Sequence, residues 1–196
     1  MITVLSGVNS YLISQRLAEL KAAFVQKYGE GGVEVYQAEQ IQPGTLQNLL
    51  GGATLFAPNR FIVIKNLSAN KLLSEQFLAL MKSVSSEVEL VLVEPSIDKR
   101  TALYKALKKD AQLVELCEME ESQLSAWVQE EVKQQEGKID PRTARTLIQY
   151  TGLDQARLSQ EISKLIAYNP EITEATIAEL VEPNPQDTVF QLLELA

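Results

Sequence analysis

The residues best placed to bind a phosphate group follow the first apolar run of the chain, residues 2–5. In nucleotide-switch ATPases a loop of the pattern G-x-x-x-x-G-K-[ST] stands at this place, and its backbone N–H groups and lysine hold the phosphates. This chain has Ser6-Gly7-Val8-Asn9-Ser10-Tyr11 there, with one glycine and no basic residue before Arg16. The spacing is also unlike the G-x-G-x-x-G pattern of dinucleotide-binding loops. The sequence therefore indicates a loop at the phosphate-binding position that lacks the residues needed to bind a phosphate.

Catalytic metal chemistry is equally poorly supported. A nucleotide-hydrolysing site needs an acidic residue at the end of its central strand to coordinate magnesium. Here the apolar run Phe61–Ile64 is followed by Lys65 and Asn66, and a lysine has the wrong charge for a metal ligand. The chain has no histidine and one cysteine, Cys117, which excludes His-dependent triads and thiolate metal clusters. We expect no catalytic, cofactor-binding or metal-binding residue, and we expect Cys117 to be a buried, unreactive thiol.

A second group of residues is suited to binding a partner rather than to catalysis. The segment 51–60 begins with two glycines, which are typical of a helix end, and Pro58 prevents an easy continuation. Leu55 and Phe56 lie between them, in a predicted loop. One interpretation is an exposed pair that fills an apolar pocket on a partner, since such anchors dominate interface energies. The other is that both side chains fold back onto the edge of the core.

The charge of the chain changes sharply along its length. It carries 18 Lys and Arg against 26 Asp and Glu, a net charge of −8, with +3 in residues 1–109 and −11 in residues 110–196. This step predicts a domain boundary near residues 110–120, and the acidic part is poorly suited to binding phosphates. A cationic segment precedes the boundary and is a candidate for contact with DNA or a neighbouring subunit, or else a solvated helix face. Its members are Lys99, Arg100, Lys105, Lys108 and Lys109.

The elements that must position these residues alternate between strand and helix patterns as far as residue 116. Short apolar runs predict strands at residues 2–6, 33–36, 61–64, 90–93 and 113–116, and apolar stripes with helical spacing predict helices at 10–28, 43–50, 73–84 and 99–109. Asp98 is the expected N-cap of the last of these helices. Such alternation predicts an α/β fold with a five-stranded, mostly parallel sheet and helices on both faces.

After Cys117 the pattern is helical only. Apolar stripes over residues 124–132, 144–148, 158–166 and 177–181 predict a small helical domain, and Pro183-Asn184-Pro185 begins a further helix that the chain does not complete. We therefore predict domains at 1–118, 119–182 and 183–196, the last being the start of a truncated domain. No run approaches the ~18 apolar residues that cross a membrane, and the N-terminus is unlike a signal peptide, so a cytoplasmic location is expected.

In the order and spacing of its motifs, the chain resembles the delta subunit family of the bacterial DNA polymerase III clamp loader. The resemblance runs along the whole chain, although each motif alone is weakly specific. The motifs are Gly51 to Phe61, Asp98-Lys99-Arg100 with Tyr104-Lys105, Leu124-Ser125-Ala126-Trp127-Val128, Glu161-Ile162-Ser163-Lys164-Leu165 with Tyr168, and Thr188-Val189-Phe190-Gln191-Leu192. The resemblance implies an AAA+-like first domain, a lid-type helical second domain and a missing C-terminal collar.

The resemblance also implies a role. A delta subunit does not hydrolyse ATP and needs no cofactor; it inserts a Leu-Phe pair into the hydrophobic pocket of the sliding clamp and helps to hold the ring open. In this sequence the pair is Leu55 and Phe56, with Ala53 and Thr54 beside it. The implied partners are the sliding clamp, the ATPase subunits and second inactive subunit of the loader, reached through the collar, and DNA within the assembly.

Three alternatives to this role stay open on the residues. An ATPase with a non-standard loop would bind ATP, although the absent lysine counts against it. A small-ligand α/β enzyme would need acid–base groups after the first and fourth strands, where mainly Ser6 and Glu94 are found. The other inactive loader subunit is disfavoured because its usual zinc-binding cysteine cluster is absent.

Overall fold

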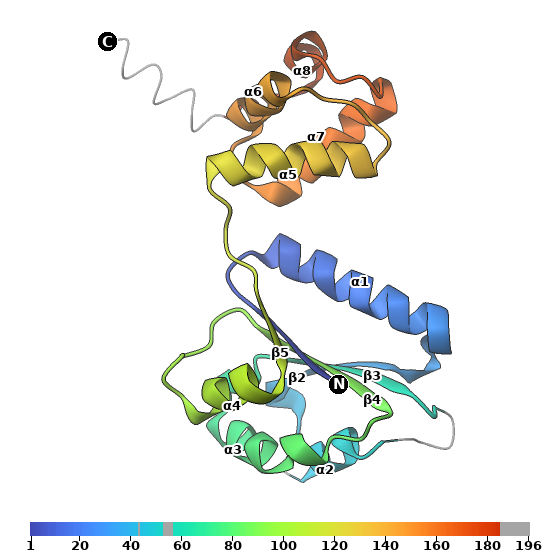
Figure 1. The fold of residues 1–196 in the computed structure, drawn as a ribbon, viewed down its shortest axis with the longest axis vertical. Coiled ribbons are helices and arrows are strands. Elements are labelled where there is room, and N and C mark those ends of the chain that lie inside the picture. The colour runs from blue at the N-terminus through green and yellow to red at the C-terminus, as the bar shows by residue number, and fades with distance from the viewer. Residues whose placement is uncertain (43, 53–56, 185–196) are drawn as a thin grey trace. The chain divides into compact units, whose positions relative to one another are not determined.

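The computed structural model describes residues 1–42, 44–52 and 57–184 of the chain. The chain divides into two compact units, Met1–Glu118 and Met119–Ala196 (Figure 1). In the first unit the strands are β1 (Ile2–Ser6), β2 (Val33–Gln37), β3 (Arg60–Lys65), β4 (Val88–Glu94) and β5 (Gln112–Glu115). Its helices are α1 (Ser10–Tyr28), α2 (Thr45–Leu50), α3 (Lys71–Leu80) and α4 (Ala102–Asp110), with short 3-10 helices η1 (Glu30–Gly32), η2 (Ala38–Gln40), η3 (Leu67–Ala69) and η4 (Met81–Ser83).

The five strands form one sheet in the order β2-β3-β4-β1-β5. Every pairing among the described strands is parallel, and the register places Val4 beside Leu92 on one side and Leu113 on the other. Parallel neighbours need a crossover connection, which the intervening helices supply. The predicted α/β fold with a five-stranded sheet is thus confirmed, and the sheet is wholly parallel where we expected it to be mostly so.

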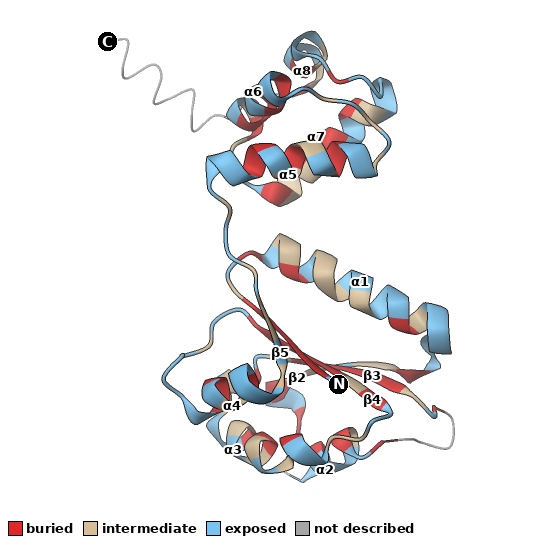
Figure 2. Cartoon of the chain, in the orientation of Figure 1, coloured by how far each residue is buried: buried red, intermediate tan, exposed pale blue. Residues whose placement is uncertain are grey.

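Two cores cover the two faces of this sheet, because successive strand residues point to opposite sides. In β3, Ile62 and Ile64 pack with the apolar side chains of α2, α3 and α4, whereas Phe61 and Val63 pack beneath α1. The central strands are therefore buried along their length, while the helices are buried only on their inner sides (Figure 2). This arrangement explains why the strand sequences read as continuous apolar runs rather than alternating ones.

The second unit contains four helices within its described residues, α5 (Glu121–Gln134), α6 (Pro141–Thr151), α7 (Gln155–Tyr168) and α8 (Glu174–Leu180). Each of the last three begins with a side-chain cap, made by Asp140, Asp154 and Thr173. Their apolar stripes meet in one core, with Leu124, Val128, Leu147, Leu158, Ile162 and Ile177 among its fully buried members. Residues 185–196 lie outside the described residues, so the predicted start of a third domain stays a prediction.

Two expectations from the sequence are wrong. The N-cap of α4 is Thr101, whose hydroxyl accepts a hydrogen bond from Tyr104 N (3.2 Å), while the Asp98 carboxylate binds the backbone and side chain of Arg100. The helix therefore begins at Ala102 rather than at Lys99, because Arg100 engages the Asp98 carboxylate and leaves Thr101 as the cap. Cys117 is exposed rather than buried, since it lies beyond the end of β5.

No helix in the described part of the chain has both the length and the apolar character to cross a membrane.

Candidate functional site

The predicted partner-binding residues occupy the connection between α2 and β3. Ala53, Thr54, Leu55 and Phe56 lie outside the described residues. The chain is described up to Gly52 and again from Ala57, so the two ends of the segment are known. A short helix precedes it and a buried strand follows it, as the sequence predicted.

The C-terminal end of α2 is bound by the side chain of Arg60, the first residue of β3. Its Nη1 donates to the backbone oxygens of Asn48 (3.3 Å) and Leu49 (3.1 Å). The same nitrogen donates to the backbone oxygen of Gly52 at 3.4 Å. The last carbonyls of a helix have no partner within the helix and carry partial negative charge, so a guanidinium there supplies both hydrogen bonds and favourable electrostatics.

The other edge of the same guanidinium binds Glu34 on the neighbouring strand β2. Arg60 Nε lies 2.8 Å from Glu34 Oε1 and Nη2 lies 3.0 Å from Oε2, the two-pronged geometry of an arginine–carboxylate pair. Tyr36 Oη donates to the same carboxylate at 2.5 Å. Arg60 is only 4% exposed, and a buried cation needs such partners. These hydrogen bonds, the one from Arg60 foremost, hold the pKa of the Glu34 carboxyl below its usual value.

The Glu34–Arg60 pair was not predicted from the sequence, although the residues carry a signal for it. Arg60 is a charged residue at the start of a strand that is otherwise wholly apolar. A cation in such a place implies a nearby acidic side chain. Glu34 supplies it from β2, the edge strand that pairs with β3.

The Glu34–Arg60 pair predicts a specific loss of stability in acid. The Glu34 carboxyl has an ordinary pKa of 4.5 and a lower one in the folded chain, so the unfolded chain binds more protons between the two values. The stabilisation is complete above the ordinary value and is lost as the pH falls through the folded value. We expect Glu34→Gln to lower the free energy of unfolding near pH 7, and the difference from wild type to shrink below pH 4.5. Urea unfolding from about pH 7 to about pH 3 measures it; a difference that stays constant over this range contradicts the assignment.

The chain on each side of the 53–56 segment, at Leu50 and at Arg60, is also attached to the turn that leads into β4. Ser85 N donates to Leu50 O at 3.1 Å, and Arg60 N donates to Glu87 O at 2.9 Å. The chain passes so close to this turn that a Cβ added at Gly52 would lie 2.8 Å from Ser85 Oγ. The end of α2 before the segment and the start of β3 after it are therefore held by one part of the fold.

The loop at the phosphate-binding position uses its amides within the protein. Gly7 N donates to Glu94 O (3.3 Å) and Asn9 N donates to Leu116 O (3.2 Å). The Asn9 carboxamide caps α1 by accepting from Leu12 N at 2.9 Å. A phosphate would have to break the two backbone bonds to use these amides, since each N–H forms one strong hydrogen bond.

The end of β3 carries Lys65 and Asn66, and the acidic group nearby lies on β4 instead. Glu94 is fully buried and its carboxylate accepts hydrogen bonds from Ser68 N (3.2 Å) and Ser68 Oγ (2.5 Å). Burial raises the pKa of this carboxyl, and the bonds from Ser68 oppose the rise. Gly7, Lys65 and Asn66 line a hollow of about 240 Å³ at this edge of the sheet. Glu94 supports η3 and is not one of the residues that line the hollow.

Two of the five cations in the 99–109 segment have acidic partners. Lys99 Nζ lies 2.9 Å from Glu115 Oε1, and Arg100 binds Asp98 with two N–O distances of 2.9 and 3.0 Å. The side chain of Arg100 holds the pKa of Asp98 at about 2. These two cations are therefore partly neutralised where they stand.

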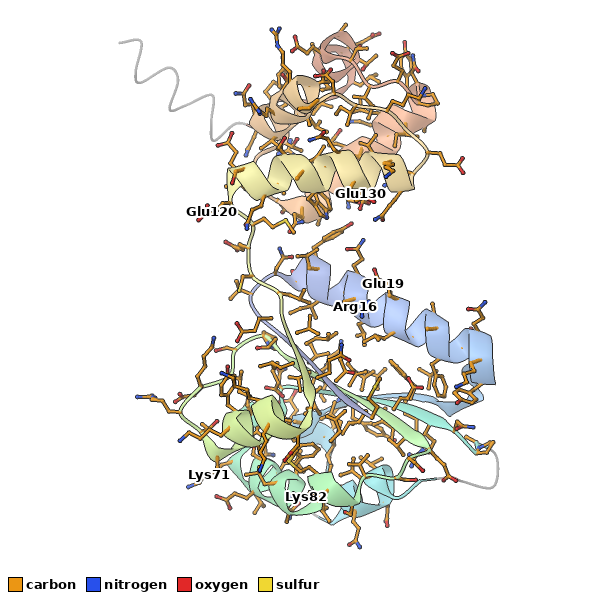
Figure 3. All side chains as sticks on the ribbon, viewed as in Figure 1. Arg16, Glu19, Lys71, Lys82, Glu120 and Glu130 are labelled. Carbon is orange, nitrogen blue, oxygen red and sulfur yellow. The ribbon has the colours of Figure 1, made fainter. Side chains whose placement is uncertain are left out.

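The other three cations lie on α4. Lys105, Lys108 and Lys109 are exposed at helical spacing, so they share one side of the helix. The same layer of helices bears Lys71 at the start of α3 and Lys82 in η4, while Arg16 on α1 pairs with Glu19 at 2.7 Å (Figure 3). The structure thus leaves α4 as the part of the predicted cationic segment that is available to an anionic partner.

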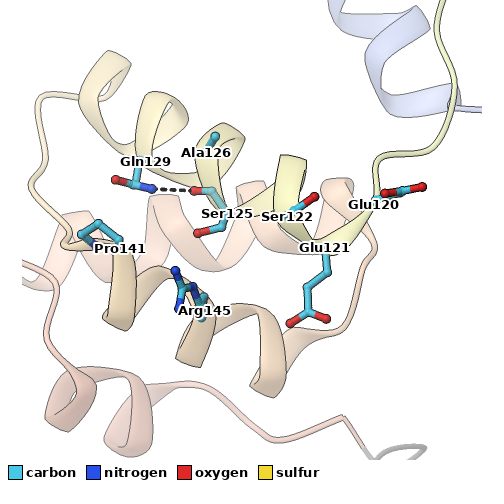
Figure 4. A pocket seen from close by; sticks show the side chains of 8 residues that line it. All are labelled: Glu120, Glu121, Ser122, Ser125, Ala126, Gln129, Pro141 and Arg145. Atoms are coloured by element: carbon cyan, nitrogen blue, oxygen red, sulfur yellow. Dashed lines mark hydrogen bonds between the residues drawn. The ribbon is translucent and has the colours of Figure 1, made fainter.

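A separate groove of about 640 Å³ lies between α5 and α6 of the second unit (Figure 4). Glu120, Glu121 and Arg145 line it together with small and polar side chains. The Gln129 carboxamide donates to Ser125 O at 3.0 Å, a bond within α5. The groove carries charges of both signs, and the Gln129 carboxamide is used by its own helix. These features favour no single chemical class of ligand.

Comparison with known proteins agrees with the fold and with the family that the sequence resembles. The sequence matches the family described as "DNA polymerase III, delta subunit" over residues 5–117, which is more than half of the chain. A comparison with curated proteins found no match.

Solved structures give the fold a close counterpart. The Bacillus subtilis DNA clamp loader delta protein (YqeN) superposes with a TM-score of 0.77 at 21% identity, over 98% of this chain and 61% of that one. The Thermotoga maritima RuvB Holliday junction branch migration motor superposes with a TM-score of 0.57 at 12% identity, over 90% of this chain and 59% of that one. At these identities the likeness concerns the fold alone, and it agrees with the predicted α/β domain followed by a helical domain. The chain spans about three fifths of either structure.

Proposed function

Because this chain belongs to the delta subunit family of the DNA polymerase III clamp loader, we propose that it binds the sliding clamp and helps to open the ring for loading onto DNA. The contact is made by Leu55 and Phe56, with Ala53 and Thr54 beside them. The matched residues 5–117 include this segment, and that inclusion is the observation that carries the proposal.

The physical support comes from what surrounds the segment. Two large apolar residues stand in a connection between a helix end and a strand start, and both of those ends are held by hydrogen bonds. An apolar pair presented from a held base is suited to a preformed apolar pocket, since little order is lost when it binds. Ala53 contributes less apolar area than a larger side chain would at that position.

Calorimetric titration of this chain with the bacterial sliding clamp tests the proposal. A saturable heat of binding supports it, and the absence of binding by the wild-type chain contradicts it.

Binding of ATP provides a separate prediction. We expect no saturable binding stronger than about 1 mM, or about 4 kcal/mol, because Gly7 N and Asn9 N donate to protein carbonyls and no lysine stands in the loop. The measurement is calorimetry with ATP and Mg²⁺, with an active loader ATPase subunit as the positive control. Micromolar binding would show instead that the loop rearranges to accept a nucleotide.

The remaining partners follow from the same family. We propose that the loader ATPase subunits and the second inactive subunit bind through a collar domain. Residues 183–196 are predicted to form the start of that domain. Lys105, Lys108 and Lys109 are proposed contacts to DNA or to an acidic subunit within that assembly, which would make the contact sensitive to salt.

A further inference from the structure

We propose that Arg60 is a positioning residue for clamp binding: it holds the end of α2 against β2 and β3, and so sets the base from which Leu55 and Phe56 are presented. This inference rests on the proposed function, because it assigns a role in the same interaction. Arg60 is 4% exposed, so it acts through the backbone that it binds at the end of α2 rather than by touching the clamp.

The Arg60 guanidinium binds on two sides at once. Its five N–H donors lie in one rigid plane. One edge, Nε and Nη2, is fixed by both oxygens of Glu34. The remaining nitrogen, Nη1, donates to backbone oxygens of Asn48, Leu49 and Gly52. Glu34 thus fixes the orientation of the plane, and the plane fixes the last turn of α2.

The contacts of Arg60 bring together the chain before and after the 53–56 segment. Arg60 begins β3, so its backbone follows the segment by a few residues, while its side chain binds Gly52, the residue just before the segment. Arg60 therefore links the start of β3 to the end of α2 across the connection between them. The backbone bonds from Ser85 to Leu50 and from Arg60 to Glu87 attach the end of α2 and the start of β3 to the turn before β4. Fixing both ends reduces the conformational freedom that must be lost when the segment enters a pocket.

A lysine at position 60 cannot replace the arginine in this role. A lysine ammonium is a compact charge with rotatable donors and lacks the planar fork. It could pair with Glu34 or bind the helix carbonyls, but it could not do both in a fixed geometry. Arg60→Lys keeps the charge and removes the orientation, which separates positioning from charge.

The experiment measures clamp affinity by calorimetry for wild type, Arg60→Lys and a control, Val91→Ala. Val91 is 2% exposed and packs beneath α1, on the opposite face of the sheet from α2, so its truncation lowers stability without touching the segment. We expect Arg60→Lys to weaken clamp binding about tenfold and Val91→Ala to leave it within about twofold. If both variants bind as wild type does, the positioning role is overturned.

Amide hydrogen exchange of the free chain gives a readout that does not depend on the clamp. The amides of Gly51 and Ser85 donate to the oxygens of Asn48 and Leu50 at the end of α2. We expect both to exchange faster in Arg60→Lys and to be unchanged in Val91→Ala. Unchanged exchange in Arg60→Lys overturns the inference whatever the clamp does, whereas a failure of wild type to bind the clamp overturns the proposed function alone.

Glu34→Gln serves if Arg60→Lys does not fold. It leaves Arg60 in place and removes the charge that orients it, so we expect the same two changes to a smaller extent, about threefold in affinity. A folded Glu34→Gln variant with wild-type affinity and wild-type exchange also overturns the inference.

Discussion

Replacing Leu55 and Phe56 together by alanine is expected to weaken binding to the sliding clamp by at least about 100-fold, or about 3 kcal/mol. The reason is the area of apolar surface removed. A leucine and a phenylalanine that enter a pocket act as anchors, and truncation of an anchor typically costs 2 kcal/mol or more, by the usual order of magnitude. Calorimetric titration with the clamp measures the effect, and circular dichroism checks that the fold is intact.

The matched control removes two exposed apolar side chains elsewhere in the first unit. Val35 on β2 is 57% exposed and Leu72 on α3 is 55% exposed, so Val35→Ala/Leu72→Ala removes two exposed apolar side chains that are not part of the 53–56 segment. We expect this variant to bind the clamp as wild type does. If the Leu55/Phe56 variant binds within about threefold of wild type, or if the control loses as much affinity, the assignment of the contact to Leu55 and Phe56 is wrong.

Gly7→Ala is expected to lower the free energy of unfolding by about 3 kcal/mol or more. Gly7 has φ +133°, a conformation that side chains rarely adopt. A Cβ there would also lie 2.1 Å from the backbone oxygen of Leu116, which accepts a hydrogen bond from Asn9 N and cannot move aside without breaking that bond. Urea unfolding followed by far-ultraviolet circular dichroism measures the change.

Gly29→Ala separates the backbone conformation from the close contact. Gly29 has φ +81°, but a Cβ added there would meet no atom within 4 Å. With ψ 174°, this conformation is essentially restricted to glycine, so the cost of Gly29→Ala should be the conformational penalty alone, about 1–3 kcal/mol. Equal effects of the two substitutions would show that the approach of Leu116 does not matter. A large difference would show that a glycine at the phosphate-loop position is needed for the packing of β5.

Much of the first unit was predictable because its signals are local and strong. Buried parallel strands give uninterrupted apolar runs, and each is followed by a helical stripe, so five strands and their order along the chain could be identified. The helix boundary at Asp98 was predicted wrongly because Asp98 and Thr101 are both good caps at sequence level. The choice between them depends on Arg100, which engages the Asp98 carboxylate in the folded chain.

The candidate site divides in the same way. The order of a short helix, the Leu55-Phe56 pair and a buried strand is written in the residues, because glycines end helices and β-branched runs form strands. The base of the segment is not, since Arg60 meets Glu34, Asn48 and Gly52 only after β2 and β3 have paired and α2 has packed on the sheet.

The sequence by itself determined the α/β pattern, the absent lysine of the phosphate loop and the place of Leu55 and Phe56, all of which depend on residue type and spacing along the chain. Only the tertiary structure decided that the amides of Gly7 and Asn9 donate to β4 and to the residue after β5, and that Arg60 joins two strands to a helix end. The physical reason is that a hydrogen bond between distant residues requires donor and acceptor to be placed within about an ångström and to be well aligned. Apolar periodicity states which face of an element is buried, but it does not state which polar groups meet there.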